Sequence, residues 1–212
     1  MQANLMLLFA AAIWGFGFVA QRLGMDFLEP FAFNGVRFLL GSCSLLPLIW
    51  WFSKNKKERP TSESSLLKAG ILAGSVLFIA AALQQVGLLY TTAAKAGFIT
   101  GLYLTLVPIL GLLLKHTTGV TTWLGAVLAV LGLYLLSIND DFSMSFGDML
   151  QFIGALFWAF HILLIDHFSG RVSPLKLSSV QFAVCGILSL LVSLVLETPS
   201  LTATLAGWQP IL

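Results

Sequence analysis

The chain has 212 residues, of which 58% are hydrophobic and only 9% are charged, and its formal net charge is +2. A water-soluble domain of this length needs far more charge on its surface, so the composition argues against a soluble globular protein. The mean hydropathy of +0.95 points instead to a protein embedded in a membrane.

Hydrophobic residues occur in long blocks, and a block of about 20 residues spans a bilayer as an α-helix. The blocks predict an all-α integral membrane protein, a multi-spanning helix bundle. The first block could instead be a cleaved signal peptide, but no Lys or Arg precedes it, so a retained helix is favoured. In chain order the predicted spans are residues 4–20, 31–52, 66–89, 93–114, 120–137, 149–167 and 175–196.

The basic residues predict the orientation, because Lys and Arg collect in cytoplasmic loops. One set of alternate loops carries eight of them, whereas the opposite set carries only Arg22 and Lys95. We therefore expect a cytoplasmic N-terminus. The eight residues are Lys54, Lys56, Lys57, Arg59, Lys68, Lys115, Arg171 and Lys176.

A weak internal repeat relates two parts of the chain at an offset of 144 residues. Five spans precede the second copy, and an odd number of spans turns that copy upside down relative to the first. We expect an inverted repeat, with a first unit of five helices at residues 1–140 and the first two helices of a second unit at residues 147–212. The identical pairs are Ala11/Ala155, Trp14/Trp158, Phe16/Phe160, Pro30/Pro174, Val36/Val180, Phe38/Phe182 and Leu46/Leu190.

Three segments carry a family resemblance: AAIWGFGFVAQRLG at residues 11–24, PFAFNGVRF at residues 30–38, and LQQVGLLYTTAAKAGFITGLYLTLVPILG at residues 83–111. They resemble the drug/metabolite transporter (DMT) superfamily, EamA type. The resemblance implies ten helices in two inverted five-helix units around a central substrate cavity. It also implies a multi-pass protein of the cell inner (plasma) membrane that exports amino acids, related metabolites or toxic small molecules.

The chain carries seven of the ten spans that the resemblance implies. We expect a truncated or fragmentary chain, and a genuine seven-span protein is the alternative. The expected partners are the lipid bilayer, a small-molecule substrate, and a second copy of the chain or a complementing chain.

Polar side chains inside spans are costly to bury in lipid and often face a substrate pathway. Gln84 and Gln85 lie deep in the third span. Adjacent residues on a helix point about 100° apart, so at most one of the two faces a cavity squarely. Its amide could hold a polar substrate group, or could instead form a hydrogen bond between helices. Lys95, near the start of the fourth span, could attract an anionic group, although snorkelling to the interface is the favoured interpretation.

The fourth span combines small, hydroxyl-bearing and helix-bending residues. Gly97 and Gly101 have the G-x-x-x-G spacing that lets helices approach closely, and Pro108 removes a backbone hydrogen bond. Thr100 and Tyr103 add hydroxyl groups. Such a helix is suited to lining a cavity and to bending, and dense helix packing would also explain it.

Trp14 and Trp158 occupy equivalent positions in the two units, and both lie away from the predicted membrane boundaries. Core packing would explain one such tryptophan, but two at symmetric positions favour the walls of a central cavity that stack on a flat or cationic ligand. His161, three residues after Trp158, could relay protons because histidine titrates near neutral pH, or could bond a neighbouring helix. Arg37, inside the second span, could belong to a substrate pathway, although an outward snorkel to a carbonyl or carboxylate partner is the favoured interpretation. Asp26 and Glu29 are the nearest acidic candidates.

The sequence carries no enzyme signature: it has no zinc-ligand spacing, no HExxH, no GxSxG and no phosphate-binding loop. We expect no enzyme activity, metal or cofactor, and the basic stretch at residues 54–59 is too short for a nucleic-acid surface. The favoured function is a secondary transporter that exports small polar or amphipathic metabolites by alternating access. The alternative is a truncated or non-transporting membrane scaffold that pairs with another chain.

Overall fold

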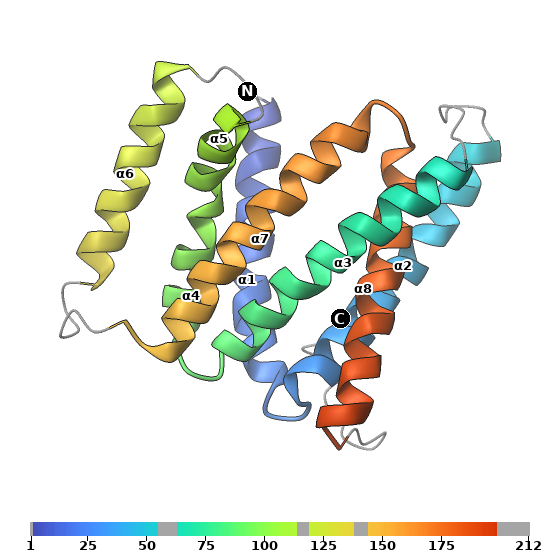
Figure 1. Ribbon diagram of the computed structural model, residues 1–212, viewed down its shortest axis with the longest axis horizontal. Coiled ribbons are helices and arrows are strands. Elements are labelled where there is room, and N and C mark those ends of the chain that lie inside the picture. The colour runs from blue at the N-terminus through green and yellow to red at the C-terminus, as the bar shows by residue number, and fades with distance from the viewer. Residues whose placement is uncertain (1, 55–62, 114–118, 138–143, 199–212) are drawn as a thin grey trace.

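The computed structural model describes residues 2–54, 63–113, 119–137 and 144–198. These residues form eight α-helices joined by short connections, and no strand occurs among them (Figure 1). The predicted all-α helix bundle is therefore confirmed. The helices are α1 (Gln2–Gly24), α2 (Pro30–Lys54), α3 (Glu63–Gly87), α4 (Ala93–Gly101), α5 (Tyr103–Leu113), α6 (Val120–Ser137), α7 (Phe146–Ser169) and α8 (Pro174–Leu196).

Each predicted span coincides with a helix or, in one case, with a pair of helices. Six of the segments are long and apolar enough to cross a membrane when residues 93–112 are taken together, and α6 is a shorter apolar helix. The predicted fourth span is divided at Leu102, whose backbone N–H bonds the carbonyl oxygens of Ile99 and Thr100. This tightened turn ends α4, and α5 starts at the next residue with Pro108 inside it.

The core of the bundle consists of α2, α3, α7 and α8 (Figure 1). In this core α2 packs along α8, and α3 packs against both α7 and α8. Buried small residues of α3 allow this close approach, as at Gly74, where an added Cβ would lie only 2.6 Å from Val184 Cβ. The α4 and α5 helices extend the core along α7, while α1 packs chiefly on α4 and α6 chiefly on α5.

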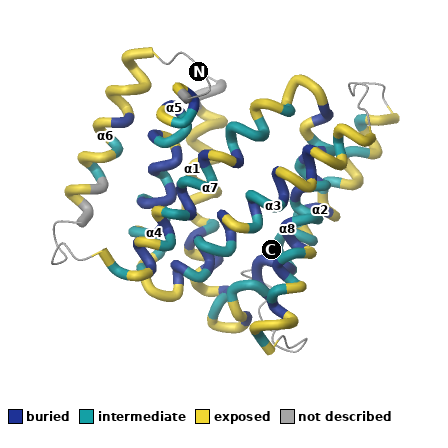
Figure 2. Tube along the Cα trace, viewed as in Figure 1, coloured by how far each residue is buried: buried dark blue, intermediate teal, exposed yellow. Residues whose placement is uncertain are grey.

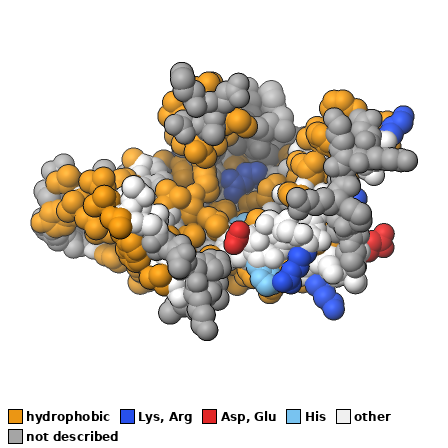
Figure 3. Space-filling view, turned by 90° about the horizontal axis from the view of Figure 1, so that it is seen from above, with side chains coloured by type: hydrophobic (Ala, Val, Ile, Leu, Met, Phe, Trp, Pro, Cys, Tyr) orange, Lys and Arg blue, Asp and Glu red, His pale blue; other side chains and the backbone are white. Residues whose placement is uncertain are grey.

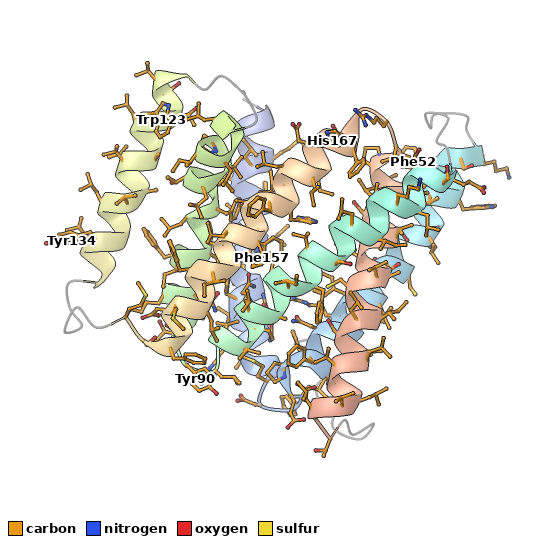
Figure 4. The ribbon with its side chains drawn as sticks, in the orientation of Figure 1. Phe52, Tyr90, Trp123, Tyr134, Phe157 and His167 are labelled. Carbon is orange, nitrogen blue, oxygen red and sulfur yellow. The ribbon has the colours of Figure 1, made fainter. Side chains whose placement is uncertain are left out.

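Large hydrophobic side chains cover the outside of the bundle, as a lipid environment requires. Figure 2 shows long exposed stretches on α1 and α6, and Figure 4 shows Tyr134 on the outer side of α6. Phe16 is 76% exposed and Val195 is 81% exposed. The protein is therefore a multi-pass membrane protein whose apolar outer surface suits contact with lipid chains.

Basic residues gather at one end of the bundle, where α2 and α7 end and where α3 and α8 begin (Figure 1). Lys54, Lys68, Arg171 and Lys176 belong to these helix ends. Figure 3 looks onto this end and shows Lys and Arg side chains around its rim. Lys56, Lys57, Arg59 and Lys115, which the orientation argument also used, lie outside the described residues.

Helix pairs separated by 144 residues begin in register but run in opposite directions. The α1 helix begins at Gln2 and α7 at Phe146, and α2 begins at Pro30 and α8 at Pro174. In Figure 1, α1 runs downward and α7 upward, while α2 runs upward and α8 downward.

Two carboxylates fasten the start of α2 to the end of α8. Glu197, just after α8, accepts hydrogen bonds from the backbone N–H groups of Phe31 (2.7 Å) and Ala32 (2.8 Å) at the first turn of α2. In return Glu29 accepts from the backbone N–H of Thr198 at 3.0 Å. These N–H groups have no partner within their own helix, so the carboxylate completes the start of α2.

Candidate functional site

Gln84, in the middle of the bundle, joins three helices through both ends of its side-chain amide. Its Nε2 donates to Gln21 Oε1 of α1 at 2.9 Å, and its Oε1 accepts from the indole Nε1 of Trp158 on α7 at 3.0 Å. The side chain is only 2% exposed. A buried polar group needs such partners, and here they bring Gln84 and Trp158, two of the predicted site residues, into direct contact.

Gln151 of α7 extends this arrangement to α4. Its Nε2 donates to the backbone oxygen of Gln84 at 2.8 Å, and its Oε1 accepts from Thr100 Oγ1 at 3.1 Å. We call Gln21, Gln84, Thr100, Gln151 and Trp158 the glutamine network. Because it connects α1, α3, α4 and α7, the network fixes how these four helices face one another.

Sequence reasoning missed two members of the network, Gln21 and Gln151. The predicted spans were residues 4–20 and 149–167, which put both glutamines at or beyond a membrane boundary. The helices actually extend to Gly24 and back to Phe146, so both side chains lie inside helical spans. Residue spacing could have indicated Gln151. The polar or aromatic residues Asp148, Gln151, Trp158 and His161 recur along α7 at intervals that place them on one side of the helix.

Gln85 has a poorer environment than its neighbour. It is fully buried, its Nε2 lies 3.5 Å from the backbone oxygen of Gln21, and its Oε1 has no hydrogen-bond partner. Adjacent side chains on a helix point about 100° apart, so the two glutamines have different neighbours. Only the Gln84 side chain bonds α7.

An aromatic cluster lies beside the glutamine network. The rings of Trp14 and Tyr103 have centroids 5.5 Å apart, those of Trp14 and Trp158 are 6.0 Å apart in a T-shaped arrangement, and those of Trp158 and His161 are 5.9 Å apart. Trp14 is 40% exposed, whereas Tyr103 is 8% exposed. The cluster thus combines a partly exposed indole with buried rings, and aromatic rings can stack on a flat or cationic ligand.

His161 is held by α8 and not by an ionised partner. One ring nitrogen, Nε2, lies 2.9 Å from Oε1 of Gln181, and both side chains are buried. The bond fixes the ring orientation, because Nε2 must carry the hydrogen to donate to an amide oxygen. The sequence suggested either a proton relay or a hydrogen bond to a neighbouring helix. The contact with Gln181 is such a hydrogen bond.

Lys95, five residues before Thr100 on α4, forms an ion pair. Its Nζ is 3.6 Å from Asp148 Oδ2. Asp148 also accepts from Thr91 Oγ1 at 2.6 Å and belongs to the capping box that starts α7. The sequence suggested that Lys95 could attract an anionic group, and in the structure that group is the carboxylate of Asp148. The ion pair joins the start of α4 to the start of α7.

Arg37 bonds an amide oxygen about one helical turn nearer the start of α2. Its Nη2 donates to Asn34 Oδ1 at 3.0 Å, and Asn34 in turn donates to the backbone oxygen of Ala81 at 3.1 Å. Of the two acidic candidates, Glu29 bonds Thr198. Among the described residues, neither Glu29 nor Asp26 reaches Arg37.

Two open grooves lie between helices, and neither is lined by the predicted site residues. One of about 450 Å³ separates α1 from α4, and another of about 480 Å³ lies among α3, α5 and α7. Within the described residues no group of three or more His, Cys, Asp or Glu side chains has the arrangement of a metal site. The linings are Gly15, Phe18, Val19, Ala93, Ala94, Gly97 and Phe98 for the first groove, and Leu72, Leu110, Phe160, Leu163, Leu164, His167 and Phe168 for the second.

Comparison with known proteins identifies relatives over most of the chain. The EamA-like transporter family model matches residues 1–138. An uncharacterized transporter of Archaeoglobus fulgidus is 36% identical over 190 residues, which are 88% of this chain and 56% of that protein. The uncharacterized transporter YetK of Bacillus subtilis is 28% identical over 186 residues, which are 84% of this chain and 56% of that protein.

A second Archaeoglobus fulgidus transporter is 29% identical and is matched over 64% of its length. The chain thus spans between 56% and 64% of the curated relatives it matches. No solved structure matches the chain.

Proposed function

Because the chain belongs to the EamA-like transporter family, we propose that it acts as a secondary transporter that exports small polar or amphipathic metabolites by alternating access. Amino acids and drug-like compounds are the expected cargo. The site of action is the aromatic cluster with the adjoining glutamine network, and the membrane is the cell inner (plasma) membrane with the N-terminus in the cytoplasm.

The symmetry of the helices supports alternating access. Residues that are equivalent at the 144-residue offset meet each other: Trp14 contacts Trp158, and Phe38 contacts Phe182 with ring centroids 5.6 Å apart. A residue touches its own counterpart when the axis relating two units passes close to it. Two such contacts, with the opposed helix directions, support an inverted repeat formed by residues 1–140 and 147–212, and such repeats rock about a central site.

The chemistry of the cluster supports a small polar or amphipathic cargo. Exposed indole surface at Trp14 can cover an apolar or cationic group. The amide of Gln84 is linked to Trp14 through Trp158, and the amides of Gln84 and Gln151 can exchange their internal hydrogen bonds for bonds to a polar substrate group. The single observation that carries the proposal is the direct hydrogen bond between Trp158 and Gln84, which joins the aromatic cluster to the polar network.

Transport by purified protein in liposomes tests this proposal. The vesicles are loaded in turn with radiolabelled amino acids and with cationic dyes, and protein-dependent flux is measured. We expect Trp14→Ala and Gln84→Ala to reduce flux at least tenfold, whereas Trp50→Ala, which removes a 67% exposed indole from α2, leaves it unchanged. Absence of flux for every compound would defeat the transporter proposal. Normal flux in both Trp14→Ala and Gln84→Ala would remove the cluster from the pathway.

A further inference from the structure

The groove that lies among α3, α5 and α7 opens on the outside of the bundle, and we call it the α7 groove. Its volume is about 480 Å³, and two residues that line it, Leu72 and Phe160, are 47% and 49% exposed. Trp158 of the glutamine network lies two residues before Phe160, so these two side chains point about 200° apart on the helix. The α7 groove therefore faces the lipid and is separate from the proposed transport site.

Hydrophobic side chains line the α7 groove over a length that suits one lipid chain. From Phe160 to Phe168 the lining follows α7 for eight residues, which at about 1.5 Å per residue is roughly 12 Å. The hydrocarbon layer of one leaflet is about 15 Å deep, half of the bilayer core. Six of the seven lining residues are hydrophobic, and the other is His167, near the end of α7 (Figure 4). The groove is thus apolar along the membrane interior and polar at the basic end of the bundle.

Lys68 lies at the same end of the groove. It is four residues before Leu72 on α3, so the two side chains share one face of the helix, with Lys68 one turn nearer the start of α3. Ala69, the next residue, belongs to one hydrophobic cluster with Phe168, which places this turn of α3 beside the end of α7. The exposed Lys68 side chain is therefore beside the polar end of the groove.

Arg171 adds a second cation in the turn that follows α7. Its backbone N–H donates to the backbone oxygen of Phe168 at 2.9 Å, which keeps Arg171 about one turn beyond His167. Its side chain is exposed. Figure 3 shows a histidine beside Lys and Arg side chains along one edge of the basic end. The side chains of Lys68, His167 and Arg171 thus gather at one mouth of the α7 groove.

The two cations at this mouth, Lys68 and Arg171, belong to no ion pair among the described residues. The described part of this end of the bundle carries two more basic than acidic residues, whereas the described part of the opposite end carries two more acidic than basic residues. The mouth is therefore complementary to a negative group. The basic end has Lys54, Lys68, Arg171 and Lys176 with Glu63 and Asp166, and the opposite end has Arg22 and Lys95 with Asp26, Glu29, Asp148 and Glu197.

We propose that the α7 groove binds an anionic phospholipid, with one acyl chain along the hydrophobic lining and the phosphate group at Lys68, His167 and Arg171. The two cations attract the phosphate, and the ring N–H of His167 can donate to a phosphate oxygen. An apolar groove accepts any acyl chain, so the basic mouth is what selects a negative headgroup. The inference does not depend on the proposed transport function.

Lipid binding to the delipidated full chain in detergent provides the test. Native mass spectrometry measures the Kd of dioleoylphosphatidylglycerol and of dioleoylphosphatidylcholine, which share their acyl chains, and of inorganic phosphate, which has none. We expect phosphatidylglycerol to bind at least about tenfold more tightly than phosphatidylcholine, because each basic side chain near the headgroup contributes about a fivefold factor. Inorganic phosphate should bind far more weakly than phosphatidylglycerol.

Substitutions at the mouth test the selection of the headgroup. Lys68→Gln should lower the preference for phosphatidylglycerol about fivefold, and the double variant with Arg171→Gln should abolish it. Lys54→Gln is the matched control, because the Lys54 ammonium lies 5.3 Å from the ring of Trp50 on α2 and does not line the groove. Lys54→Gln should preserve the preference.

A substitution inside the groove tests the place of the acyl chain. Leu72→Trp fills the groove and should weaken the binding of both lipids. Leu131→Trp is the matched control, since Leu131 is a 51% exposed leucine on α6, and it should leave the binding of both lipids unchanged.

Equal Kd values for the two lipids would overturn the inference, as would a preference that survives the double substitution at the mouth. Phosphate that binds as tightly as phosphatidylglycerol would make the mouth a site for a free anion. A dimer that Leu72→Trp dissociates would assign the groove to a second copy of the chain. The mouth variants change only exposed side chains, so they decide the question even if Leu72→Trp does not fold.

Discussion

Replacing Gly74 by alanine tests how closely α3 and α8 must approach. The added Cβ would lie 2.6 Å from Val184 Cβ and 2.8 Å from the backbone oxygen of Gln181. Ordinary contact begins near 3.4 Å, so the two helices would have to separate by about 0.6–0.8 Å. Neither neighbouring atom is the end of a flexible side chain, and the backbone must therefore move.

The expected cost follows from two opposing contributions. Overpacking a tight interface costs about 1–3 kcal/mol, whereas replacing glycine by alanine within a helix returns about 0.5–1 kcal/mol. The difference for Gly74→Ala is a destabilisation of about 0–2.5 kcal/mol, with a central value of about 1 kcal/mol. Gly125→Ala on α6 is the matched control, because a Cβ there meets nothing within 4 Å and leaves only the favourable contribution.

The measurement is the fraction of monodisperse protein that remains in detergent after heating, which gives an apparent midpoint. The midpoint should fall for Gly74→Ala and should stay level or rise for Gly125→Ala. Equal midpoints for the two variants would refute the close packing of α3 on α8.

Three further substitutions probe the polar contacts. Gln84→Leu should lower stability by about 1–3 kcal/mol and shift tryptophan emission, because the Trp158 indole loses its acceptor; an unchanged spectrum contradicts that bond. A double-mutant cycle of Lys95→Met and Asp148→Asn should give a coupling of about 0.5–1 kcal/mol, and additive effects would show that the ion pair contributes nothing. Glu197→Ala should cost about 1 kcal/mol and speed hydrogen exchange of the first amides of α2, whereas unchanged exchange would contradict the carboxylate contact.

The spans could be predicted from the sequence because lipid imposes one dominant rule. A hydrophobic block in lipid must form a helix, because only then do its backbone N–H and C=O groups all find hydrogen-bond partners. The seven predicted spans match seven helical segments, and their predicted ends differ from the observed ends by at most four residues. The break at Leu102 was harder to foresee. Gly101 and Pro108 signalled a bend in the fourth span, but the position of the tightened turn depends on hydrogen bonds that hydropathy does not encode.

The candidate site was predictable only in part because it depends on how helices rotate about their axes. The repeat placed Trp14 and Trp158 in equivalent positions, and their contact is observed. Hydropathy could not show that Gln151 bonds the backbone of Gln84, since that contact depends on the crossing of α7 over α3. It also could not distinguish Gln84 from Gln85, whose surroundings differ although the residues are adjacent.

The reciprocal carboxylate contacts at Glu197 and Glu29 determine where the molecule can flex. Because they join the start of α2 to the end of α8, and because the two helices pack closely along their length, we expect α2 and α8 to move together. The α1 helix is attached differently, through the side chains of Gln21 and Arg22 and through the ring contacts of Trp14. If the protein rocks as proposed, we expect α1 to move relative to the α2–α8 pair, a motion that would break the hydrogen bond between Gln84 and Gln21.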